Sequence, residues 1–193
     1  MRILNGTEKE HLLFITFNTR KIFKEFKDLP EEMKNNWLKK FNDDNSVDIY
    51  DKRAEHYAEY SEISEITVGV SASGKIREKT FNNQSEYELL TEFVEFLEGE
   101  KIKNKYAFCG YNINKFMLPF MFKRLIVNKI KMPVILDTSG LKPWEVATID
   151  LYDIWQANSL VSTDLKTVCD TLSIKENSDI KAMMEIFDIL KSV

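Results

Sequence analysis

The chain has 193 residues, of which 44% are hydrophobic and 12% aromatic, and its formal net charge at pH 7 is −4. This length and composition are typical of one compact folded domain and exclude a largely disordered chain. The negative net charge excludes a global basic field that would draw the protein to nucleic acid, although a local basic groove remains compatible with it. We therefore expect a single domain over residues 1–193.

Two further features bear on where the protein acts. No apolar run approaches the length of a membrane-spanning helix, and the first residues lack the apolar stretch and cleavage site of a signal peptide. The cysteines Cys109 and Cys169 form neither a metal-ligand cluster nor a disulfide framework, so each is expected to pack as a small apolar residue. We predict a cytoplasmic protein with no membrane partner, and the sequence leaves its oligomeric state open.

The N-terminal third combines one buried strand with a polar, helical segment. Residues 11–18 are almost continuously apolar, which predicts a central strand buried on both faces. The string Asp28-Leu29-Pro30-Glu31-Glu32 is a helix-start signal, with a capping residue, an early proline and acidic residues behind it. Residues 42–45 predict a loop, and residues 46–60 predict a helix.

The middle of the chain predicts a hairpin, a helix and a second buried strand. Residues 63–70 and 75–81 have the composition of two strands, joined by a Ser-Ala-Ser-Gly turn. Residues 85–98 carry apolar side chains at helical spacing, with Ser85 as the cap. A strand at residues 106–111 and a helix at about residues 115–127 follow.

The C-terminal part predicts one short strand and two closing helices. Residues 133–144 are rich in turn formers, and the remaining elements are expected at residues 147–151, 162–172 and 178–191. A hairpin followed by alternating helices and strands predicts an α/β fold with a mixed β-sheet flanked by helices. Residue propensities alone do not select one such fold.

The most informative segment is residues 110–124, with the sequence GYNINKFMLPFMFKR. It combines a strand end, an Asn-rich turn and a helix with an apolar face. It resembles the second motif of the DEDD 3′–5′ exonucleases, in particular the bacterial proteins related to the proofreading domain of DNA polymerase B. In those proteins the segment follows the pattern HNgkxFDxPfLxxR, and the Asp is a metal-binding carboxylate.

The resemblance continues along the chain in the order of the family. It covers roughly residues 11–180 and implies an RNase H-like fold, a mixed β-sheet flanked by helices in a single domain. The similar segments are DLPEE at residues 28–32 with Trp37, YDKRAEHYAEY at residues 50–60, IKMP at residues 130–133, KPWEV at residues 142–146, DLYDIW at residues 150–155 and LKTV at residues 165–168.

The departures from the family pattern fall on the metal-binding carboxylates. The first motif, flDiET, aligns so that Thr16 and Asn18 stand at its Asp and Glu, and Met117 stands at the Asp of the second motif. The chain ends at Val193, before a full-length version of the third motif region would finish, and the sequence leaves open whether the domain is truncated there or naturally short. In a shortened version, Asp188 would match the last Asp and Met184 the Tyr before it. At best one of the four carboxylates remains.

These replacements matter because two-metal phosphodiester hydrolysis holds two dications only about 4 Å apart, which requires several anionic oxygens. A hydroxyl, a neutral amide and a thioether are poor ligands for Mg²⁺ or Mn²⁺. We therefore predict no catalytic residue, no metal site and no cofactor; Mg²⁺ or Mn²⁺ would be needed only by an active enzyme. A replacement site built from Asp137, Asp150 and Asp153 is the less favoured alternative.

Binding is the function that the resemblance leaves open. Part of the second motif borders the cleft that takes a 3′ single-stranded end in the family, where aromatic rings stack on bases and Lys or Arg meets phosphate. The structural alternative is core packing for Phe116 and Met117 and a solvated helix surface for Asp188. The candidate nucleic-acid contacts are Asn112, Asn114, Lys115, Phe116 and Arg124.

Three hypotheses follow. The first is a catalytically inactive 3′–5′ exonuclease-like domain that binds single-stranded nucleic acid or a protein partner. The second is an active, metal-dependent 3′–5′ exonuclease with a remodelled site. The third is a protein–protein adaptor with a vestigial cleft, which the net charge of −4 favours slightly over nonspecific DNA binding. Converging carboxylates would favour the enzyme, and a basic, aromatic-lined cleft would favour nucleic acid.

Overall fold

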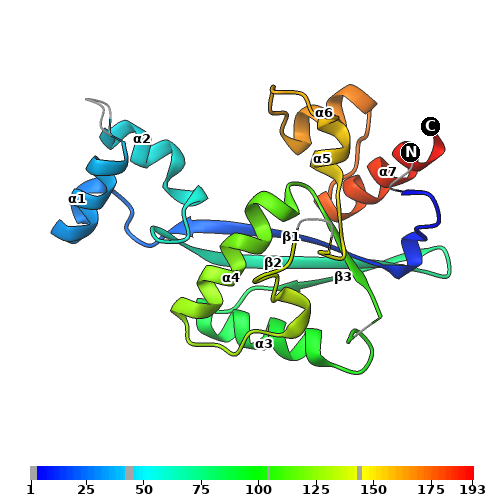
Figure 1. The fold of residues 1–193 in the computed structure, drawn as a ribbon, viewed down its shortest axis with the longest axis horizontal. Helices are drawn as coiled ribbons and strands as arrows, with labels where there is room; N and C mark the ends of the chain where they lie inside the picture. Colours follow the sequence, from blue (N-terminus) through cyan, green and yellow to red (C-terminus); the bar gives the residue numbers. More distant parts are fainter. Residues whose placement is uncertain (1–3, 42–45, 104, 143–144) are drawn as a thin grey trace.

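The computed structural model describes residues 4–41, 46–103, 105–142 and 145–193. A central β-sheet has helices on both faces, and two further helices lie beyond one end of the long strands (Figure 1). No helix within these ranges is long and apolar enough to cross a membrane. The loop expected at residues 42–45, and Pro143 and Trp144 of the KPWEV segment, lie outside the described residues.

The sheet is mixed, and its strand order is β3-β2-β1-β4-β5. Strand β1 is central: it pairs antiparallel with β2 and parallel with β4, β2 pairs antiparallel with β3, and β4 pairs parallel with β5. The expected α/β fold is confirmed, and this order and these directions are compatible with an RNase H-like fold. The strands are β1 (Leu12–Lys21), β2 (Ser61–Ala72), β3 (Lys75–Phe81), β4 (Ala107–Gly110) and β5 (Thr148–Asp150).

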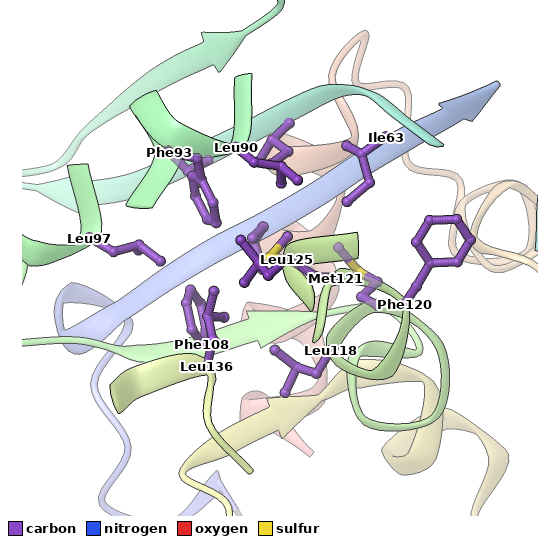
Figure 2. Packing of buried hydrophobic residues seen from close by; sticks show 14 of the residues in the cluster. Ile63, Leu90, Phe93, Leu97, Phe108, Leu118, Phe120, Met121, Leu125 and Leu136 are labelled. Carbon is purple, nitrogen blue, oxygen red and sulfur yellow. The ribbon is translucent and has the colours of Figure 1, made fainter. Parts of the chain in front are cut away.

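One face of the sheet is covered by α3 (Glu86–Glu98) and α4 (Leu118–Val127). The expected cap of α3 is confirmed, because the Ser85 hydroxyl accepts a hydrogen bond from the backbone N–H of Glu88. Leucine and phenylalanine side chains from α3 and α4 meet over the strands (Figure 2). The labelled members of this core are Ile63, Leu90, Phe93, Leu97, Phe108, Leu118, Phe120, Met121, Leu125 and Leu136.

The opposite face carries α5 (Leu151–Gln156), α6 (Leu165–Leu172) and α7 (Asp179–Ser192). Helix α7 lies on β1 and β2, and its close approach depends on Gly69 of β2: a Cβ at Gly69 would overlap Cγ2 of Ile180. Cys109 is fully buried in this second core, as expected for a small apolar residue. The helix α5 was missed by the sequence, because its six residues are too few for a recognisable period.

The segment between β1 and β2 forms a small aromatic core of its own. Trp37 is fully buried there and lies edge-on to Tyr50, Tyr57 and Tyr60 at ring-centroid distances of 5.1, 5.5 and 4.8 Å. This segment lies beyond the end of the sheet from which β1 leaves (Figure 1). Its elements are η3 (Phe26–Asp28), α1 (Glu31–Lys40), α2 (Ser46–Arg53) and η4 (Ala54–His56).

Several boundaries differ from the sequence expectations for local reasons. The cap of α1 is Pro30, because Asp28 ends the 3₁₀ turn before it. The helix expected over residues 46–60 ends at Arg53 and tightens into η4. The first four residues of β1 are buried on both faces of the sheet. The later residues of the strand are only partly buried or exposed, because they extend beyond the two hydrophobic cores. The remaining short turns are η2 (Lys9–His11), the π-helical η5 (Ile113–Met117) and η6 (Val134–Leu136).

Candidate functional site

A polar hollow lies on the sheet face where α7 begins. Its volume is about 300 Å³, and both Thr16 and Asn18 contribute to its wall. Alternation along β1 sends these two side chains to the α7 face, while Ile15 and Phe17 point to the other core. The other lining residues are Glu65, Thr67, Glu78, Thr80, Asn177, Ser178, Asp179 and Ile180, together with Phe17.

Strand register explains why these polar groups meet. Thr16 pairs with Thr67, and the Thr67 Oγ1 lies 3.0 Å from the Thr80 Oγ1 on the next strand. Asn18 pairs with Glu65, and its Nδ2 donates to Glu65 Oε1 at 3.1 Å. A row of hydroxyl and amide groups therefore crosses three neighbouring strands beside a carboxylate.

Two more carboxylates come from β3 and from the start of α7. The Ser178 hydroxyl donates to Glu78 Oε2 at 2.8 Å, which ties the cap of α7 to the strand. Asp179 occupies the first turn of α7 and lines the same hollow. Among the described residues, the lining includes three carboxylates and no Lys or Arg, so it carries negative charge.

The structure does not bring the other two family positions to this hollow. Met117 is 6% exposed and packs in the core beneath α3 and α4, on the opposite face of the sheet from Thr16. Asp188 pairs with Lys9, next to the amino end of β1. It lies roughly 13 Å further along α7 than Asp179, at 1.5 Å per residue. Met184, expected at the Tyr position, is buried in the core of α7.

The residues that the resemblance aligns with metal ligands do not fit a pair of hard dications. Thr16 and Asn18 offer neutral oxygens, the Met117 thioether lies in an apolar core, and Asp188 is held elsewhere by Lys9. Within the described ranges, no group of three or more His, Cys, Asp or Glu side chains is arranged to hold a metal ion. We therefore derive no catalytic step through Mg²⁺ or Mn²⁺.

A second hollow of about 300 Å³ contains two of the expected nucleic-acid contacts, Asn114 and Lys115. The Lys115 Nζ lies 2.6 Å from Asp153 Oδ1, so its charge is paired within the chain. The other residues of its wall are mostly apolar, and they are Leu118, Thr138, Leu141, Val146 and Asp153. None of these residues lines the first hollow.

Asp150 holds the turn that leads to this second hollow. Its carboxylate accepts hydrogen bonds from the backbone N–H groups of Asn112, Asn114 and Tyr152 at 2.9, 3.0 and 3.0 Å. Burial raises the pKa of Asp150, and these hydrogen bonds oppose that shift. Asp150 thus joins the end of β5 to the turn after β4, and Asp153 pairs with Lys115, which leaves neither carboxylate free for a rebuilt metal site.

Phe116 and Arg124 both have partners inside the protein. Phe116 is half-buried, with its ring centroid 5.6 Å from those of Phe17 and Phe120 and 5.9 Å from that of His56. Arg124 is 5% exposed and forms a two-pronged ion pair with Glu86 at 2.6–3.0 Å. Its third nitrogen donates to the carbonyl of Ala58 at 2.8 Å. The guanidinium is therefore not available to a phosphate, and we leave Arg124 out of any binding surface.

Sequence reasoning missed the carboxylates of the first hollow. Glu65, Glu78 and Asp179 are far from Thr16 and Asn18 along the chain, and only strand pairing and the docking of α7 unite them. The hairpin carried a signal that could have found one of them. The alternation Glu65-x-Thr67-x-Gly69 puts the polar side chains of β2 on one face of the sheet, where they pair with Thr16 and Asn18 of β1.

The similarity of this chain to known proteins is structural rather than one of sequence family. No family model and no curated protein matches the sequence. A solved structure of the family B DNA polymerase from the hyperthermophilic archaeon Pyrobaculum calidifontis is similar over 94% of this chain, with 14% sequence identity and a TM-score of 0.49. This chain spans 23% of the length of that polymerase chain. We base the fold on the strand order and take nothing from the activity of the polymerase.

Proposed function

We propose that this protein is a non-catalytic, exonuclease-like domain of RNase H-like fold that binds a protein partner through the hollow around Thr16 and Asn18. The observation that supports this proposal is the composition of that hollow. It combines neutral groups, at two positions that the resemblance aligns with metal ligands, with the carboxylates of Glu65, Glu78 and Asp179, and the described residues of its lining include no Lys or Arg.

A negative hollow disfavours nucleic acid. A phosphodiester backbone carries one charge per nucleotide, and proteins that bind it neutralise those charges with Lys and Arg. Without metal ions to bridge them, phosphate oxygens and the carboxylates of Glu65, Glu78 and Asp179 repel each other. A Lys or Arg side chain of a partner protein complements the same groups by charge-assisted hydrogen bonds.

The proposal is tested by comparing two probes. A short fluorescein-labelled oligolysine peptide and a labelled single-stranded DNA are titrated with the protein at low ionic strength, where surface charge effects are least screened. We expect the peptide to bind and the DNA to show no saturable binding. The paired substitution Glu65→Gln and Glu78→Gln is expected to weaken peptide binding about tenfold, equivalent to about 1.4 kcal/mol.

The matched control is the pair Glu95→Gln and Glu176→Gln, which removes the same charge from two exposed positions outside the hollow. If the control pair weakens the peptide as much as the hollow pair, binding reports net charge only and the proposed site is wrong. Saturable DNA binding with no peptide binding would contradict the proposal and support the nucleic-acid alternative.

A further inference from the structure

The outer edge of β3 is a second candidate surface, and two residues of this strand, Glu78 and Thr80, also line the hollow around Thr16 and Asn18. Strand β3 ends the sheet order, so within the described residues its outer edge has no neighbouring strand. Six of its seven residues, from Lys75 to Thr80, are exposed. The other edge strand, β5, has three residues and leads directly into α5. A long exposed edge presents a row of unpaired backbone groups that accept another strand.

The hairpin geometry identifies the outward groups. Ser73 and Gly74 form a two-residue turn, both with positive φ (51° and 74°), as in a type I′ turn. Such a turn is closed by a hydrogen-bonded pair, here Ala72 and Lys75. Bonded and non-bonded pairs then alternate along the ladder. The backbone N–H and C=O groups of three residues therefore point away from β2, and these residues are Ile76, Glu78 and Thr80.

The side chains beside this edge indicate the chemistry of an added strand. Lys75, Arg77 and Lys79 alternate along β3 and so lie on one face of the sheet. Lys79 pairs with Glu92 at 3.1 Å, whereas Lys75 and Arg77 form no ion pair with the described part of the chain. Directly opposed charges on neighbouring strands stabilise the pairing when their signs differ. An acidic strand is therefore complementary to this face.

An apolar hollow of about 150 Å³ opens next to these basic residues. Arg77, Glu78 and Lys79 of β3 and Gly69 of β2 contribute to its lining, and the rest comes from the aliphatic and aromatic residues Leu13, Val68, Val70, Phe96 and Ile102. It is large enough for one small aliphatic side chain. A segment that alternates acidic and aliphatic residues on this face would satisfy both the charges and the hollow.

Other occupants fit less well. A second copy paired antiparallel through the same edge would bring Lys75, Arg77 and Lys79 against the same basic residues, which destabilises the pair. Nucleic acid would meet the basic side chains, but phosphates have no N–H donors for the outward carbonyl groups of β3. We propose that the outer edge of β3 is a docking site for an extended, acidic segment of a partner protein, which adds to the sheet as a further strand.

The test uses a labelled peptide of the pattern Glu-Thr-Val-Thr-Glu-Thr-Val, which places Glu and Val alternately on one face of an added strand, with fluorescence anisotropy as the readout. Ile76→Pro removes one outward N–H without breaking a bond to β2, because proline is tolerated on an edge strand where its nitrogen faces solvent. Ile76→Val keeps that N–H. We expect the wild-type protein and Ile76→Val to bind the peptide, and Ile76→Pro to lose about tenfold or more in affinity. Arg77→Glu should weaken binding similarly, and circular dichroism checks that each variant is folded.

Amide hydrogen exchange supplies a readout that does not depend on substitutions. The outward amides of Ile76, Glu78 and Thr80 should exchange quickly in the free protein and become protected when the peptide is added, whereas the inward amides of Arg77 and Lys79 are protected throughout. Absence of peptide binding by the wild-type protein would overturn the proposal. Equal affinity of Ile76→Pro and Ile76→Val, or binding of single-stranded DNA in place of the peptide, would overturn it as well. The edge is probed with an acidic peptide and the hollow with a basic one. A failure of one proposal is therefore distinguishable from a failure of the other.

Discussion

Met117 has an apolar role at the position where the resembled family has its second carboxylate. Its side chain is 6% exposed, between the sheet and helices α3 and α4. Met117→Leu keeps the volume and should change the free energy of unfolding by less than about 1.5 kcal/mol. Met117→Asp buries an unpaired carboxyl group and should cost about 3 kcal/mol or more. Urea unfolding measures both values. A stable Met117→Asp protein that Mg²⁺ stabilises further would show that this side chain reaches a metal site.

Arg124 lies in a segment that resembles a nucleic-acid-binding motif, but its guanidinium group holds α4 against α3. It connects α4 to Glu86 of α3, and Glu86 also accepts hydrogen bonds from Ile63 N–H and Asn128 Nδ2 at 2.7 Å each. Arg124→Met leaves a buried, partly unpaired carboxylate and should cost about 3–5 kcal/mol. The double variant Arg124→Met with Glu86→Leu should be less destabilised than Arg124→Met alone.

Chemical unfolding of Arg124→Met, of Glu86→Leu, of the double variant and of the wild type gives the coupling between these residues. The contradictory result is an Arg124→Met protein of normal stability that has lost binding to single-stranded DNA. That combination would mean that the guanidinium leaves Glu86 to meet phosphate.

At the scale of elements, the position of α7 depends on a glycine in the sheet beneath it. Gly69→Ala places a methyl group against Cγ2 of Ile180, so α7 must shift or the side chain must leave its rotamer. The expected cost is about 1–3 kcal/mol. Ile180→Ala in the same chain removes the overlap, so the double variant should be more stable than the sum of the two single effects predicts. Thermal unfolding measures this coupling, and strict additivity would show that α7 does not lie on Gly69.

The elements that the sequence predicted well are those defined by local signals. Ser85 and Ser178 stand at the caps of α3 and α7, and the Ser-Gly turn joins β2 to β3, because each of these features depends on residues within one turn of the chain. The helix α5 was missed, and residues 46–60 were extended too far, because the docking of these segments sets their lengths.

The candidate site was predictable only in part. The motif pattern identified Thr16 and Asn18, and β1 alternation places them on one face. Local sequence carries no information that Met117 faces the opposite core or that Asp188 pairs with Lys9. The carboxylates of Glu65, Glu78 and Asp179 reach the hollow through strand register and helix docking, which are long-range properties.

At the scale of the whole molecule, the two faces of the sheet are covered unequally. Helices α3 and α4 cover one face, while α7 crosses the other and leaves the second half of β1 and the neighbouring threonines open. Near the amino end of β1, Lys191 of α7 bonds to the carbonyl of Thr7 and pairs with Glu8, which fixes the far end of that helix. The molecule therefore combines a mixed sheet, whose strand order is compatible with an RNase H-like fold, with a polar hollow where the second half of β1 is left uncovered.

We propose that the hollow around Thr16 and Asn18 does not support hydrolysis of nucleic acid. The most direct measurement follows 3′-labelled single-stranded DNA and RNA during incubation with the protein, in Mg²⁺ and separately in Mn²⁺. The same assay is run on a variant that combines Glu65→Gln, Glu78→Gln and Asp179→Asn. We expect no shortening above background with either protein in either metal. Metal-dependent shortening by the wild type that this variant abolishes, and that the Glu95→Gln and Glu176→Gln control retains, would contradict the account and place a working site in the hollow.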